Sequence, residues 1–123
     1  MFGHVVCFKW NRELDAADIK RIHDALTDLA SVVPGLVEYR FGPDLGHGGE
    51  KNWDYAIVAK FNSESDWRVY DSHPVHDKVR AEVFKSIIAE RSAVQFSGSS
   101  GFERAPDQHR GEVAAVLSGR IVV

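Results

Sequence analysis

The chain has 123 residues, of which 44% are hydrophobic and 27% charged, a composition typical of one globular domain. The net charge is -3 and the basic residues are scattered among acidic ones, which gives no electrostatic surface for nucleic acid. No apolar run approaches the roughly 20 residues that cross a bilayer, no signal-peptide pattern opens the chain, and the single Cys7 excludes an intrachain disulfide. We therefore expect a cytoplasmic protein without a membrane or nucleic-acid partner.

The first strand is predicted at residues 2–10, where apolar side chains alternate between two faces. His4 shares one face with aromatic and aliphatic residues, whereas the other face carries Val5 and Cys7. Because both faces are largely apolar, we expect the strand to be covered on both sides.

A helix is predicted next, after Asp15, because a carboxylate at this position can cap a helix N-terminus. The apolar residues that follow recur at steps of three and four, which places them on one buried face. They are Ile19, Ile22, Leu26, Leu29 and Val33. Pro34 and Gly35 end the helix, and the pattern of residues 36–41 predicts a second strand.

The middle of the chain predicts a loop and a third strand. Residues 43–52 hold three of the ten glycines, which is typical of a flexible loop, and this loop could border a pocket. Residues 53–61 alternate clearly and predict a strand with Trp53 and Tyr55 on its more apolar face.

Two helices are then predicted on either side of a proline. The first begins after Ser63, a capping residue, and carries Trp67 and Tyr70 one turn apart. It ends at His73, because a residue that precedes proline is disfavoured in the helical region, and Pro74 suits the first turn of the second helix. The buried side of the second helix is expected to comprise Val75, Val79, Val83, Phe84, Ile87 and Ile88.

A last strand at residues 92–96 completes one domain, which we place at residues 1–97. Residues 98–123 are predicted to form a linker and a C-terminal extension, rich at first in Ser, Gly, Pro and charge. Within it, residues 113–117 resemble a short helix and residues 120–123 a strand. This extension is either an arm that adds to a partner's sheet or a frayed tail.

The order of these elements is βαββαβ, which predicts a ferredoxin-like α+β fold: a four-stranded antiparallel sheet with its helices on one face. The other face then carries Val5, Cys7, Ala56 and Val58. An apolar patch of this kind calls for a partner, and we expect a homodimer through the open sheet face.

Four segments carry a family resemblance. They are HVVCFKW at residues 4–10, VVPGLVEYRFG at 32–42, WDYAIVAKFNS at 53–63 and YDSHPVHDKV at 70–79. Over roughly residues 2–97 the chain resembles the stress-responsive dimeric α/β-barrel (Dabb) family, and its most specific match is the stretch Tyr70, His73, Pro74 and His76. The resemblance implies a dimeric α+β barrel.

The family includes stress-associated proteins with no assigned chemistry and a few cofactor-independent enzymes, among them a cyclase that makes olivetolic acid. Similarity to that cyclase implies that His76 acts as a base, that Tyr70 is its hydrogen-bonding partner, and that His4 lines the same pocket. The cyclase has a further histidine where this chain has Tyr55, so the substrate should differ. Likeness of fold does not by itself carry over function.

The residues themselves support part of this site. Helix period places His76 on the buried side of its helix, where burial and the helix dipole both favour the neutral imidazole that a general base requires. We expect His4 and Tyr55 to face the same cavity, with Trp67, His73 and Phe84 also contacting the ligand. The structural alternatives remain open: His73 as a helix cap, and the others as ordinary core residues.

The sequence thus predicts a cofactor-independent lyase, cyclase or isomerase that acts on a small aromatic or carbonyl-containing molecule through a His/Tyr acid-base pair. One alternative is a non-catalytic stress-associated or ligand-binding dimer, and another is a monooxygenase-like barrel. No metal is expected, because the two histidines around Pro74 lack the i, i+4 spacing of helical zinc ligands.

Overall fold

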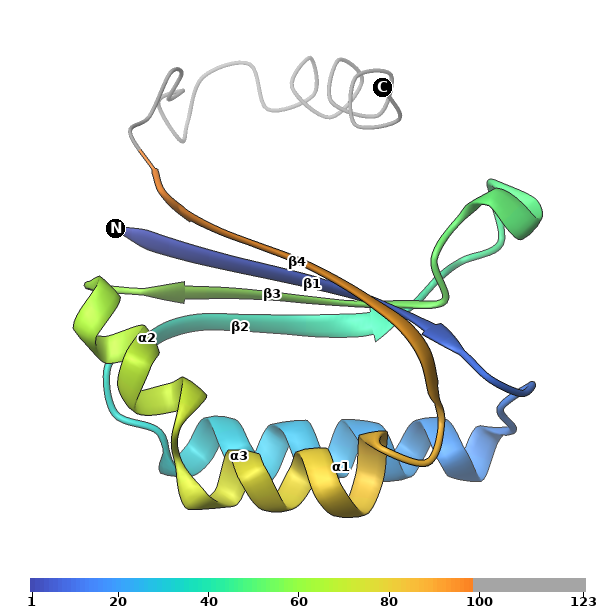
Figure 1. The fold of residues 1–123 in the computed structure, drawn as a ribbon, viewed down its shortest axis with the longest axis horizontal. Coiled ribbons are helices and arrows are strands. Elements are labelled where there is room, and N and C mark those ends of the chain that lie inside the picture. Colours follow the sequence, from blue (N-terminus) through green and yellow to red (C-terminus); the bar gives the residue numbers. More distant parts are fainter. Residues whose placement is uncertain (99–123) are drawn as a thin grey trace, which may run out of the picture.

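The computed structural model describes residues 1–98, which form a four-stranded antiparallel sheet with helices on one face (Figure 1). The strands are β1 (Phe2–Trp10), β2 (Leu36–Pro43), β3 (Tyr55–Phe61) and β4 (Ile88–Ser97). They lie in the order β2-β3-β1-β4, and each neighbouring pair is antiparallel. The predicted ferredoxin-like α+β fold is confirmed. Nearly all of the predicted C-terminal extension lies outside the described residues.

Helix α1 (Ala16–Val32) begins where the sequence predicts it. The Asp15 side chain accepts a hydrogen bond from the Asp18 backbone N–H, and the Asp18 carboxylate accepts one from the Asp15 N–H, so the two residues form a capping box. The buried face comprises Ile22, Leu26 and Leu29. After the helix, Gly35 has a φ of 79°, a left-handed conformation that favours glycine at this turn.

The second helical region contains a feature that the sequence pattern does not predict. Helix α2 (Glu64–Asp71) is followed by α3 (Pro74–Val79), and His73 caps α3 by accepting a hydrogen bond from the Val75 N–H. Beyond α3 the chain widens into a π-helical turn, η2 (Arg80–Phe84), in which the Lys85 N–H bonds to the Arg80 carbonyl. Single π turns of this kind are often found at functional sites.

Several strand boundaries differ from the prediction. Ile88, expected on the buried side of the helix, begins β4 and pairs with Trp10 of β1, so the last strand starts before residue 92. The third strand begins at Tyr55, two residues later than expected, and the Asp54 carboxylate just before it accepts a hydrogen bond from the Trp10 N–H. The 3-10 turn η1 (Gly49–Lys51) interrupts the glycine-rich loop.

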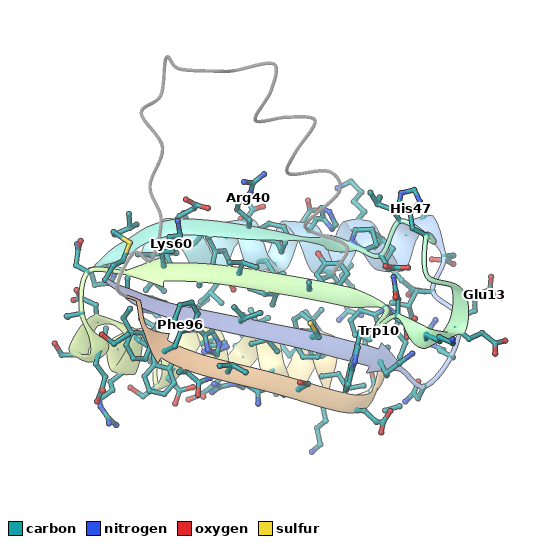
Figure 2. All side chains as sticks on the ribbon, turned by 90° about the horizontal axis from the view of Figure 1, so that it is seen from above. Trp10, Glu13, Arg40, His47, Lys60 and Phe96 are labelled. Atoms are coloured by element: carbon teal, nitrogen blue, oxygen red, sulfur yellow. The ribbon has the colours of Figure 1, made fainter. Side chains whose placement is uncertain are left out.

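Helices α1 and α3 run side by side beneath the sheet, and Figure 2 looks onto the opposite face, on which Phe96 lies. This uncovered face contains exposed apolar side chains: Val58 is 36% exposed, Val94 57% and Phe96 50%. The Phe96 ring lies across Gly3, where an added Cβ would come within 2.7 Å of the ring. Of the helices in residues 1–98, none is long and apolar enough to cross a membrane.

Candidate active site

A cavity of about 430 Å³ lies on the helix side of the sheet, bordered by α3, η2 and the facing strands. Most of its wall is apolar: Val6, Phe8, Leu26, Ile57, Val79, Ala81, Phe84 and Ile88. Three uncharged polar side chains also line it, namely His4, Tyr70 and His76. A mostly apolar cavity of this size with a few convergent polar groups is typical of small-molecule sites.

His76 is held in one tautomer by the break between α2 and α3. Its Nδ1 lies 3.0 Å from the backbone carbonyl oxygen of Tyr70. Because a carbonyl oxygen only accepts hydrogen bonds, the neutral imidazole carries its proton on Nδ1, and Nε2 retains the free lone pair. The ring also packs on Tyr70, with 4.3 Å between the ring centroids. His76 therefore has the form of a general base.

The electrostatics of the cavity keep His76 neutral. Burial lowers its pKa, the positive charge of Arg80 lowers it further, and the hydrogen bond to the Tyr70 carbonyl opposes both effects only in part. At neutral pH the imidazole is therefore uncharged, as proton abstraction requires.

His4 carries its ring proton on the other nitrogen from His76. Its Nδ1 lies 2.8 Å from the Nε2 amide of Gln95, on the adjacent strand β4, and accepts a hydrogen bond from it, so the neutral His4 ring carries its proton on Nε2. Burial lowers the pKa of His4 to about 4, and the positive charge of Arg91 adds a smaller contribution. His4 is thus a neutral hydrogen-bond donor, whereas His76 is a neutral acceptor.

Tyr70 contacts His76 in a way that differs from the expectation. Its hydroxyl bonds to the hydroxyl of Tyr39 at 2.9 Å, and it meets His76 through its ring and its backbone carbonyl. Burial raises the pKa of both tyrosines, so both are protonated at neutral pH. Tyr70 therefore orients the histidine, and Tyr39 orients Tyr70. The sequence reasoning missed Tyr39, for which the only signal was its place in the alternating pattern of β2.

Of the other expected contact residues, Phe84 lines the cavity and three do not. Tyr55 is only 1% exposed, and its hydroxyl lies 3.2 Å from Nδ1 of His23, away from the cavity. His23, which belongs to α1, is partly buried and shares this contact. His73 serves as the cap of α3. Trp67 stacks on Phe2 and packs beside the His4 ring, but it does not line the cavity.

Charged residues at the cavity wall were also missed. Asp77, Arg80, Lys85 and Arg91 line it, and they come from α3, η2, the residue after η2 and the start of β4. No local motif marks them, and the approach of Arg91 depends on the position of β4 beside β1. The alternation of β4, which places Arg91 on the same side as Gln95, could have indicated the orientation of Arg91.

A second hollow, of about 520 Å³, lies under the glycine-rich loop and includes Cys7 and Trp53. Polar contacts stabilise this loop, for which the sequence predicts flexibility. The Lys9 ammonium donates to the backbone carbonyl of Asn52, and the Asp44 carboxylate accepts from the Gly46 N–H and the Asn52 amide. Within residues 1–98, no group of three or more His, Cys, Asp or Glu residues could hold a metal ion.

Comparisons with solved structures extend these observations. A dimeric ferredoxin-like protein of unknown function from Thermobifida fusca is 34% identical, with 79% of this chain and 90% of that chain covered and a TM-score of 0.71. A hydroxynitrile lyase from Passiflora edulis is 19% identical, with coverages of 83% and 96% and a TM-score of 0.69. An antibiotic biosynthesis monooxygenase is 8% identical, with coverages of 81% and 100% and a TM-score of 0.61.

The last two similarities are too low in sequence to show more than a shared fold. No curated protein matches the sequence significantly. The model of the stress responsive A/B barrel domain matches residues 2–97, which cover the whole sheet and all the helices described above. The chain therefore belongs to the stress-responsive A/B barrel (Dabb) family.

Proposed function

We propose that the histidine-lined cavity is the active site of a cofactor-independent enzyme that removes a proton next to a carbonyl group of a small organic molecule. The observation that carries this proposal is the pair of neutral histidines in one apolar cavity, with the proton of His4 on Nε2 and that of His76 on Nδ1. A base and a hydrogen-bond donor that line the same cavity suit the formation of an enolate.

In the proposed step, Nε2 of His76 takes a proton from the carbon next to the carbonyl. The electron pair of the broken C–H bond forms the C=C bond of an enolate, and the carbonyl π pair moves onto oxygen, which accepts a hydrogen bond from Nε2–H of His4. His76 then returns the proton, either to another carbon in an isomerisation or to the alkoxide formed when the enolate attacks a second carbonyl. Carbon–carbon cleavage follows the second route in reverse.

The test is hydrogen–deuterium exchange, because it detects proton abstraction before the natural product is known. We expect the protein to accelerate exchange of the protons next to the carbonyl in a panel of aryl ketones and oxo acids in D₂O, followed by NMR. Removal of a general base typically costs about 10²–10⁴-fold, so His76→Ala should lose exchange by this factor. His47→Ala, in the exposed loop, is the control.

Exchange at the parental rate in a folded His76→Ala variant would rule out this mechanism. Ligand binding without exchange across the panel would favour the alternative of a non-catalytic ligand-binding protein, whereas oxygen consumption with these compounds would favour the monooxygenase-like alternative. The histidine pair specifically supports proton transfer over both alternatives.

We also propose that two copies of this chain pair through the uncovered sheet face. Its exposed Val58, Val94 and Phe96 form the apolar surface that such an interface requires. The similar ferredoxin-like proteins from Thermobifida fusca and Bacteroides fragilis are dimeric. Sedimentation velocity should give a dimer for the parent and a monomer for Val58→Glu. The control is Val69→Glu, which adds the same charge at an exposed valine of α2. A monomeric parent, or a dimeric Val58→Glu variant, would contradict this interface.

A further inference from the structure

The charged part of the cavity wall carries an excess of positive charge. Its three cations are Arg80, Lys85 and Arg91, and its one carboxylate is Asp77. Arg80 is already engaged, because it forms ion pairs with Asp71 at 2.6 Å and with Asp77 at 3.1 Å. Lys85 and Arg91 form no ion pair with any residue in 1–98. The two cations without a counter-charge therefore lie on the wall of the proposed active site.

The position of Arg91 ties this charge to the histidines. Arg91 lies opposite Phe8 in the register of β1 and β4, on the same helix-facing side as the pair of His4 and Gln95. Its charge acts on the cavity, because after burial it is the next largest cause of the lowered pKa of His4. Lys85 reaches the same wall directly after the π-helical turn.

Cations beside an apolar hollow are suited to an organic anion. A carboxylate can accept two parallel hydrogen bonds from the planar guanidinium of Arg91, while the Lys85 ammonium adds a compact positive charge. The body of such a ligand would pack against the apolar wall next to Phe84. A neutral ligand would use neither cation.

We propose that the ligand of this cavity is an oxo acid whose carboxylate binds Arg91 and Lys85 and whose carbonyl end lies between His4 and His76. The role of the carbonyl end rests on the function proposed above, whereas recognition of the carboxylate requires no turnover. Arg91 and Lys85 are then the residues that select charged over neutral carbonyl compounds.

Two probes that differ in charge test this directly: 3-benzoylpropionate and its methyl ester, with binding to the full chain measured by calorimetry. The acid should bind at least tenfold more tightly than the ester at low ionic strength. Added salt should weaken binding of the acid and leave the ester unchanged, because only the acid is attracted to these cations by its charge. Binding of the acid should also raise the pKa of His4 in an NMR titration, because the carboxylate offsets the charge of Arg91.

Arg91→Gln and Lys85→Gln should each remove most of the preference for the acid. Lys78→Gln is the matched control, because Lys78 is an exposed residue of α3 that does not line the cavity. Arg91→Lys, which retains the charge, should keep part of the preference, and it remains informative if Arg91→Gln does not fold. Equal binding of acid and ester, no binding of either probe, or an unchanged preference in both Gln variants would overturn the proposal.

His76→Asn separates this inference from the proposed reaction. If this variant loses proton exchange but keeps the preference for the acid, both proposals stand. A parent that prefers the acid but never catalyses exchange would refute the reaction alone. Exchange without any preference for the acid would refute the anion site alone.

Discussion

Acidification should destabilise this protein through His4, a histidine that is 3% exposed. Its pKa is about 4 in the folded protein, against an ordinary value of 6.5, so between these values the unfolded chain binds a proton that the folded protein does not. Stability therefore falls as the pH drops through this window, and the contribution of His4 is fully present above it. The complete difference corresponds to about 3.5 kcal/mol, at about 1.4 kcal/mol for each tenfold change in proton affinity.

The assay compares urea unfolding of the parent and of His4→Gln at about pH 7 and about pH 4.5, at one protein concentration. Over that interval the titration of His4 alone should cost the parent about 2 kcal/mol. This corresponds to about 1 M in urea midpoint for a slope near 2 kcal/mol per M. Glutamine retains a polar partner for Gln95 but cannot titrate, and the pH response of His76 is common to both proteins.

The quantity of interest is the difference between the two pH responses, so any uniform loss of stability in His4→Gln cancels. NMR titration of the His4 ring provides an independent value for its pKa. Parallel pH responses in the two proteins, or an NMR pKa near 6.5, would refute the conclusion that His4 is buried and neutral, and the donor role proposed for it would lose its basis.

Two further predictions concern the helix ends and turns. Asp15→Ala removes the capping box with Asp18 and should lower the free energy of unfolding by about 1 kcal/mol in urea titrations; an unchanged value would contradict the cap. Gly35→Ala and Gly46→Ala both add a Cβ at positive φ, but only at Gly35 would the Cβ approach the Asp66 side chain, within 2.7 Å. Gly46→Ala should therefore cost about 1–2 kcal/mol from backbone conformation alone and Gly35→Ala clearly more, as measured by thermal unfolding; equal costs would disprove the steric clash.

The elements that the sequence predicts well depend on neighbours along the chain. The repeat of Ile22, Leu26 and Leu29 marks a buried helix face because residues three and four apart share one side of a helix. The break at His73 follows from the restriction that Pro74 imposes on the residue before it. The same local rules do not reveal the π-helical turn, which no sequence period marks.

The candidate site was predictable only in part for the same reason. The placement of His4 and His76 on inward-facing positions follows from strand and helix periods, and both line the cavity. Tyr55 lies on the same face of the sheet by strand period, but its hydroxyl contacts His23 of α1 and not the cavity. Strand period predicts the face on which a side chain lies, but it does not predict which helix residue that side chain contacts.

The sequence by itself thus determined the βαββαβ order, the helix caps and the family, since each rests on short segments whose physical constraints are local. Tertiary structure alone decided the chemistry of the cavity. The tautomer of His4 depends on Gln95, 91 residues away, and the positive wall depends on where β4 brings Arg91. Such contacts are set by strand register and by packing of the helices on the sheet, which bring together groups whose separation along the chain carries no signal.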